Sequence, residues 1–224
     1  MGGRGSSSSK GGGGGKNLSS KGGTKIRIVS EEDIWSTRHN PSNAPFADDI
    51  NSGVRDIQGD FDGVMNTVNT VVAAELGGKD KDSVLGYYGQ GRLGINKEYT
   101  NPAKMNRVYD EATKTGYHPS RGNKSGTEAV TYHEMGHAIA DHLKTKLGAK
   151  DSAEASKIIV HNANKTVTGK NNGTLSFAKG ISAYAADSYS ECVAEAVTDW
   201  YCNGNKAAKA SKAIVAEMKR INAL

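Results

Sequence analysis

Two histidines four residues apart, His133 and His137, stand in the pentapeptide HEMGH. Side chains at this spacing lie on one face of an α-helix, so the two imidazoles can bind the same metal ion. Glu134 follows the first histidine and can place its carboxylate near that metal, where it can take a proton from a bound water. The HExxH pattern is typical of zinc-dependent hydrolysis of peptide bonds.

The residues around this motif favour a buried helix over about residues 126–147. Ser125 or Thr127 can cap its start, and Gly148 stands where it would stop. The residues near the two histidines are uncharged, as expected for a metal-binding helix packed into a core: Val130, Thr131, Tyr132, Met135, Gly136, Ala138 and Ile139.

A catalytic zinc ion usually has three protein ligands, and the third must come from outside this helix. Leu143 occupies the position that carries the third histidine in the longer pattern HExxHxxGxxH. A second expected helix, residues 189–201, offers Glu191, Glu195 and Asp199 along one stripe of an otherwise apolar surface. Buried carboxylates need cationic partners, which zinc and the histidines would supply; a solvated acidic face is the alternative.

The segment Tyr184–Val197, YAADSYSECVAEAV, resembles the Y-x6-E-x3-E segment of anthrax lethal-factor-type gluzincin peptidases. Similar domains occur in phage minor head proteins and bacterial mobile elements. The resemblance covers the metal helix and this second helix. It implies a zincin-like fold in which Glu191 is a zinc ligand, Glu195 orients a zinc-bound histidine, and the Tyr184 hydroxyl stabilises the oxyanion. The family's paired aromatics after the ligand are replaced here by Cys192 and Val193.

A second register of the same segment stays open. Glu195 and Asp199 also form a Glu-x3-Asp pair, in which Glu195 would bind zinc and Tyr189 would stand nearer the role of Tyr184. We favour the register in which Glu191 is the ligand.

With the fold that this resemblance implies, we expect an α+β, zincin-like metallopeptidase domain over residues 25–224, mostly helical with a small mixed sheet. Apolar residues recur at intervals of four and three from Ile50 to Val71 and predict one helix over residues 47–76. Strands are expected at 25–30 and, in the segment 84–99, as two short strands with the second near 92–98. Further helices are expected at 102–115, 152–160, 189–201 and 206–222.

A disordered arm rich in glycine, serine and lysine is expected over residues 1–24. The net charge of +5 comes from the N-terminus, because residues 1–29 hold six basic side chains and no acidic one. The remaining residues carry 23 basic and 24 acidic side chains, so we expect no specific nucleic-acid binding by the folded domain.

Neither a membrane nor an oxidising compartment is expected. The chain has no apolar run near the ~20 residues that span a bilayer, and its N-terminus lacks the apolar region of a signal peptide. Cys192 and Cys202 lie about 15 Å apart along one helix, too far for a disulfide. These features predict a cytoplasmic protein, and the resemblance to domains of phage minor head proteins implies the host cytoplasm or association with a virion.

Other polar residues near the motif receive weaker assignments. His118 beside Pro119 can line the cleft or be solvated, and we favour solvation. His142, five residues after His137, is expected to face away from the metal. Asp141, four residues after His137, can orient that histidine or be a surface carboxylate.

Two functional hypotheses follow. The first is a zinc-dependent endopeptidase that uses Zn²⁺, acts on a protein or peptide substrate, and is encoded by a phage or prophage. The second is a phage head-associated structural protein that keeps a zincin fold with little or no turnover. In that case phage structural proteins would be its partners.

Overall fold

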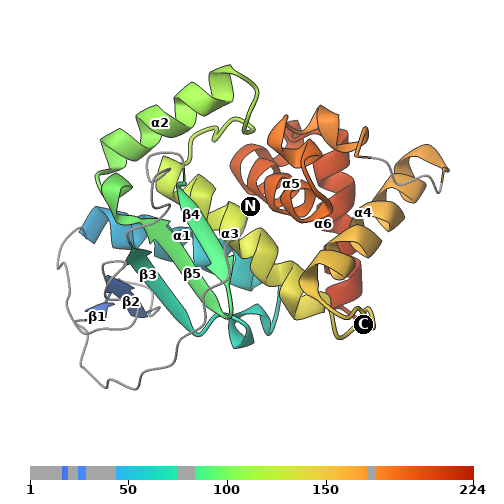
Figure 1. The fold of residues 1–224 in the computed structure, drawn as a ribbon, viewed down its shortest axis with the longest axis horizontal. Helices are drawn as coiled ribbons and strands as arrows, with labels where there is room; N and C mark the ends of the chain where they lie inside the picture. The colour runs from blue at the N-terminus through green and yellow to red at the C-terminus, as the bar shows by residue number, and fades with distance from the viewer. Residues whose placement is uncertain (1–16, 20–24, 29–43, 75–83, 171–174) are drawn as a thin grey trace.

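The computed structural model describes residues 17–19, 25–28, 44–74, 84–170 and 175–224 (Figure 1). The helices are α1 (Ala44–Asp60), α2 (Pro102–Lys114), α3 (Gly126–Leu143), α4 (Ser152–Thr168), α5 (Tyr189–Asn203) and α6 (Lys209–Asn222). The strands are β1 (Asn17–Ser19), β2 (Lys25–Ile28), β3 (Thr70–Ala74), β4 (Gly86–Gly89) and β5 (Arg92–Asn96). The expectation of a mostly helical α+β domain with a small mixed sheet is confirmed.

The sheet has the strand order β1-β2-β3-β5-β4. The pairs β2–β3 and β3–β5 are parallel, whereas β1–β2 and β4–β5 are antiparallel. Gln90 and Gly91 connect β4 to β5 with φ angles of 51° and 75°, the left-handed conformation of tight hairpin turns. In this strand order β4 lies at an edge of the described sheet, with β5 as its neighbour.

The prediction of a single helix over residues 47–76 is wrong. Helix α1 ends at Asp60, a short 3₁₀ helix covers Val64–Asn66, and β3 begins at Thr70. Gly63 adopts a φ of 80° before the 3₁₀ helix and breaks the α-helical path. The apolar stripe still marks buried positions, because both the helical and the strand residues on it enter the core.

Helix α3 lies between the sheet with α1 on one side and the C-terminal helices α4–α6 on the other (Figure 1). Of the two expected caps, Ser125 fills the role in the structure. Its Oγ accepts from the backbone N–H of Glu128, and the Glu128 carboxylate accepts from the N–H of Ser125. This capping box fixes where the metal-binding helix begins.

The expected bounds differ most at the ends of two helices. Helix α3 ends at Leu143, before the predicted 147, while α4 runs to Thr168, well past the predicted 160. Of the predicted arm, Asn17–Ser19 forms β1, and its other residues lie outside the described ranges. Each helix in the described ranges is too short or too polar to traverse a lipid bilayer.

Gly136, inside the HEMGH motif, lets α3 and α5 touch. A Cβ placed on Gly136 would lie 2.7 Å from the Cα of Ala194, which is closer than two carbon atoms can pack. The obstacle is backbone, which cannot rotate away as a side chain can. The two helices that carry the candidate site therefore meet at backbone distance.

Gly136→Ala is expected to lower the free energy of unfolding by about 1–3 kcal/mol, because the added methyl group forces the helices apart. Urea unfolding of the metal-free protein measures it. Gly59→Ala is the matched control, since a Cβ there meets nothing within 4 Å. That exposed helical change should stabilise the protein by about 0.5–1 kcal/mol. Equal effects of the two substitutions would contradict the close contact.

Candidate metal centre

Three side chains from two helices converge on one point. His133 and His137 project from α3, and Glu191 projects from the first turn of α5, where Ser188 caps the helix by accepting from the Glu191 N–H. One ligand atom from each lies within 4.8 Å of the others. Oε2 of Glu191 is 3.1 Å from Nε2 of His133 and 3.6 Å from Nε2 of His137. Tetrahedral ligands at typical zinc distances lie about 3.3 Å apart, so this spacing fits a metal ion.

The Glu191 carboxylate itself indicates a missing partner. Its Oε2 is buried and forms no hydrogen bond with the described residues, although Nε2 of His133 lies 3.1 Å away. A buried carboxylate oxygen without a partner is unfavourable. A divalent cation would satisfy it together with the two ring nitrogens. The residues present therefore fit a metal ion.

Glu195 holds the other side of the His133 ring. The Nδ1–H of His133 donates to Oε1 of Glu195 at 2.8 Å, and the Ser182 hydroxyl donates to Oε2 at 2.7 Å. A carboxylate can only accept, so His133 carries its proton on Nδ1 and turns Nε2 toward Glu191. This is the placement expected for a residue that orients a metal ligand.

Two residues of the alternative register, Asp199 and Tyr189, make their hydrogen bonds away from His133 and His137. Asp199 accepts hydrogen bonds from the backbone N–H of Ala208 at 2.8 Å and from the Ser211 hydroxyl at 2.6 Å. It therefore ties the end of α5 to the start of α6. The hydroxyl of Tyr189 lies 3.2 Å from Nε2 of His161. The structure brings Glu191 to the Nε2 atoms of the histidine pair and Glu195 to Nδ1 of His133.

Glu134 and Tyr184 border the same point. Glu134 is almost fully buried, and burial raises the pKa of its carboxyl group. Tyr184 lies in the short 3₁₀ helix Tyr184–Ala186, and its ring stacks on that of His133 with centroids 5.8 Å apart. Burial, reinforced by the Glu191 charge, raises the Tyr184 pKa, so its hydroxyl keeps its proton at neutral pH.

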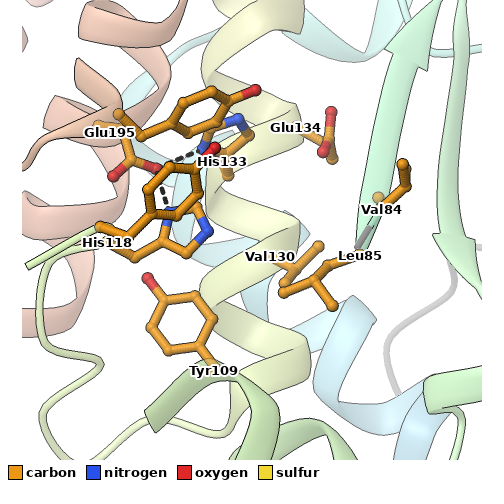
Figure 2. A pocket seen from close by; sticks show the side chains of 11 residues that line it. Val84, Leu85, Tyr109, His118, Val130, His133, Glu134 and Glu195 are labelled. Atoms are coloured by element: carbon orange, nitrogen blue, oxygen red, sulfur yellow. Dashed lines mark hydrogen bonds and ion pairs between the residues drawn. The ribbon is translucent and has the colours of Figure 1, made fainter. Parts of the chain in front are cut away.

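The expectation that His118 is solvated is wrong. Its side chain is 13% exposed, and its Nδ1–H donates to Oε1 of Glu195 at 3.0 Å (Figure 2). The loop between α2 and α3 is held there by backbone hydrogen bonds from Ala183 to Gly116 and from Tyr184 to Tyr117. Loop residues follow no periodic pattern, so the sequence offered only the proximity of His118 to the metal helix.

The remaining polar residues do not join the metal group. The Asp141 carboxylate accepts from the Tyr88 hydroxyl at 3.2 Å and from Lys144 at 2.6 Å, so these groups occupy it instead of His137. His142 pairs with Asn222 of α6 at 3.0 Å and faces away from the metal group as expected. Both cysteines are free, also as expected.

Two hollows flank the metal group along β4. A pocket of about 130 Å³ lies beside Glu134 and Glu195 and is walled partly by Val84, Leu85 and Val130 (Figure 2). An open groove of about 520 Å³ is lined by the metal group itself, by Asp141 and by residues of β4. An extended ligand lying along β4 would reach both hollows and pass the metal group.

No protein-family model, no curated protein and no solved structure matches this chain. What can be said of the site therefore comes from its own geometry. The His133, His137 and Glu191 group is consistent with an HExxH…E zincin-like site in a helical domain with a small mixed sheet.

The purified chain is expected to bind one zinc ion. Glu191→Ala should lose the tightly held ion, because it removes a direct ligand, whereas Glu195→Ala should weaken affinity about 10- to 100-fold by releasing the His133 ring. Zinc titration against a competing chelator measures both. Asp199→Asn is the control and should keep the affinity of the wild type. Greater loss with Glu195→Ala than with Glu191→Ala would reverse the assignment.

The metal-free protein should lose stability as the pH rises above 6.5, the ordinary pKa of a histidine. Burial opposes the charge on His133, but Glu191 and Glu195 outweigh burial and raise its pKa well above the ordinary 6.5. That contribution is full below pH 6.5 and is lost as pH rises through the folded-state pKa. The lowered pKa values of the two carboxyl groups act in the opposite direction, and their contribution is lost only as pH falls below about 4.5.

Urea unfolding at several pH values, with and without zinc, measures this dependence. Because zinc competes with the His133 proton, the stabilisation by zinc should grow as the pH rises. A metal-free stability that stays level as the pH rises above 6.5 would contradict the pairing of His133 with both carboxylates.

Proposed function

We propose that this chain is a zinc-dependent endopeptidase. The observation that carries the proposal is the position of Glu134, a buried carboxylate of raised pKa beside a His₂Glu metal-binding group and facing a hollow. A general base in such a site works best when its pKa lies nearer neutrality than that of an exposed carboxylate. Two nitrogens and one oxygen, with no cysteine, suit zinc best.

When bound, zinc lowers the pKa of a coordinated water and polarises the scissile carbonyl. Glu134 accepts the proton of the attacking water on its carboxylate and passes that proton to the leaving amine. Tyr184, protonated at neutral pH, donates its hydroxyl to the oxygen on which negative charge develops. Glu195 keeps the His133 ring in the tautomer that leaves Nε2 free to bind metal.

The proposed partner is an extended segment of a protein or peptide. Strand β4 pairs with β5 on one side, and its other side borders the hollows along the metal group. An edge strand presents backbone donors and acceptors that can pair with a peptide in extended conformation. Such pairing would hold a peptide bond opposite Glu134.

The structural alternative, a phage head-associated protein with little turnover, stays a prediction. It depends on the arm, residues 1–24, of which the structure describes only Asn17–Ser19. The phage or prophage origin likewise stays a prediction. A structural role with little turnover does not account for the buried carboxylate of Glu134 as directly as proton transfer does.

Glu134→Gln should keep zinc and lose cleavage by about 10²- to 10⁴-fold, because the amide cannot accept the proton of the attacking water. The test combines the zinc content of the purified variant with cleavage of an unbiased peptide mixture followed by mass spectrometry. Glu128→Gln on the same helix is the matched control, since Glu128 serves the helix cap. Cleavage by Glu134→Gln at the wild-type rate would refute the proposed mechanism.

A further inference from the structure

His118 presents one unused ring nitrogen at the pocket beside the metal group. Its Nδ1–H is committed to Glu195, and Nε2 has no hydrogen-bond partner among the described residues. The ring lines the pocket, and the side that carries the second nitrogen is turned toward Val130 and Leu85 (Figure 2). In the neutral ring with a proton on Nδ1, Nε2 is a hydrogen-bond acceptor.

The ring of His118 is held in this orientation from two sides. Tyr109 stacks against it with centroids 5.3 Å apart and an interplanar angle of 12°, and the buried Tyr109 hydroxyl has no hydrogen-bond partner among the described residues. Tyr117 meets its edge at 4.9 Å. The acceptor is therefore preorganised, and the hydrogen bond it forms with a ligand does not require the ring to be reoriented.

The pocket is small and has one apolar wall. Val84, Leu85 and Val130 form a wall across from His118. The volume of about 130 Å³ is close to that of an engineered protein cavity, about 150 Å³, that binds benzene. One aromatic ring therefore matches the available space.

We propose that this pocket selects a tyrosine side chain of the substrate, with His118 as the residue that determines the selection. The substrate ring would pack on the apolar wall, and its phenolic O–H would donate to Nε2 of His118. The inference rests on the proposed peptidase function and names the residue class that the peptidase prefers beside the cleaved bond.

The charges near the pocket disfavour the other polar classes of side chain. Acidic side chains would lie near the carboxylates of Glu134 and Glu195, which repel them. Lysine or arginine would have to leave water beside the apolar wall, and the Glu195 carboxylate is fully buried and already accepts from His118, His133 and Ser182. Phenylalanine fits the space but leaves the His118 acceptor unpaired.

The test compares peptides that differ only by tyrosine or phenylalanine at each position around the cleaved bond. For the zinc-loaded full chain we expect kcat/KM to favour tyrosine about tenfold at one fixed position. His118→Asn keeps an N–H that can donate to Glu195 and, because the side chain is shorter, places no acceptor at the position of Nε2. It should bring the ratio to about one, mainly by slowing the tyrosine peptide, while zinc content stays at one ion per chain. His142→Asn is the matched control and should leave the ratio unchanged.

A wild-type ratio near one, a ratio unchanged in His118→Asn, or a stronger preference for acidic or basic residues at that position would overturn the inference. If the zinc-loaded wild type cleaves no peptide, the proposed function fails. The pocket assignment is then tested by the affinity of the protein for the two peptides. Zinc-loaded Glu134→Gln should then bind the tyrosine peptide more tightly than the phenylalanine peptide, and the added His118→Asn change should remove the difference. Equal affinities in Glu134→Gln would overturn the pocket assignment.

Discussion

The contact between α3 and α5 at Gly136 and Ala194 is the constraint on which the candidate site depends. At this distance, side chains on the two helices meet directly without an intervening layer. Glu191 and Glu195 lie about one helical turn apart on α5 and reach different nitrogens of one imidazole, Nε2 and Nδ1 of His133. A wider helix separation would remove both contacts together, so the glycine belongs to the site although it has no side chain to contribute.

Burial favours a raised pKa for all three glutamates of the site, but the groups around each carboxylate differ, and so do the resulting pKa values. Positive partners outweigh burial at Glu191 and Glu195 and lower their pKa values. At Glu134 the charges of His133 and His137 do not outweigh burial, so its pKa is raised. One cluster thus contains two carboxylates suited to holding a charge in place and one suited to exchanging a proton. Divergent pKa values of neighbouring acids commonly separate their chemical roles in this way.

The sequence was sufficient to predict the features that depend on local spacing. HEMGH predicted the histidine pair on α3, and the acidic stripe of the later helix offered Glu191, Glu195 and Asp199, because both follow from helical periodicity. The resemblance to gluzincin peptidases favoured Glu191 as the ligand. The same reasoning failed over residues 47–76, where an apolar spacing of four and three continued past Gly63 into a strand. His118 was misjudged because its burial depends on backbone hydrogen bonds between Gly116–Tyr117 and Ala183–Tyr184, two segments far apart in sequence.

The edge strand constrains the site from the side opposite α5. A Cβ on Gly86 would lie 2.7 Å from Val130 and 2.8 Å from the Glu134 carboxylate, so the strand approaches the metal helix as closely as a glycine permits. Glu134 is therefore confined between β4 and α3. The two ends of the cleft differ, since one is a compact, largely apolar pocket and the other an open groove bordered by the Asp141–Lys144 pair. A peptide that pairs with β4 meets unlike surroundings at these ends, which favours one chain direction over the other.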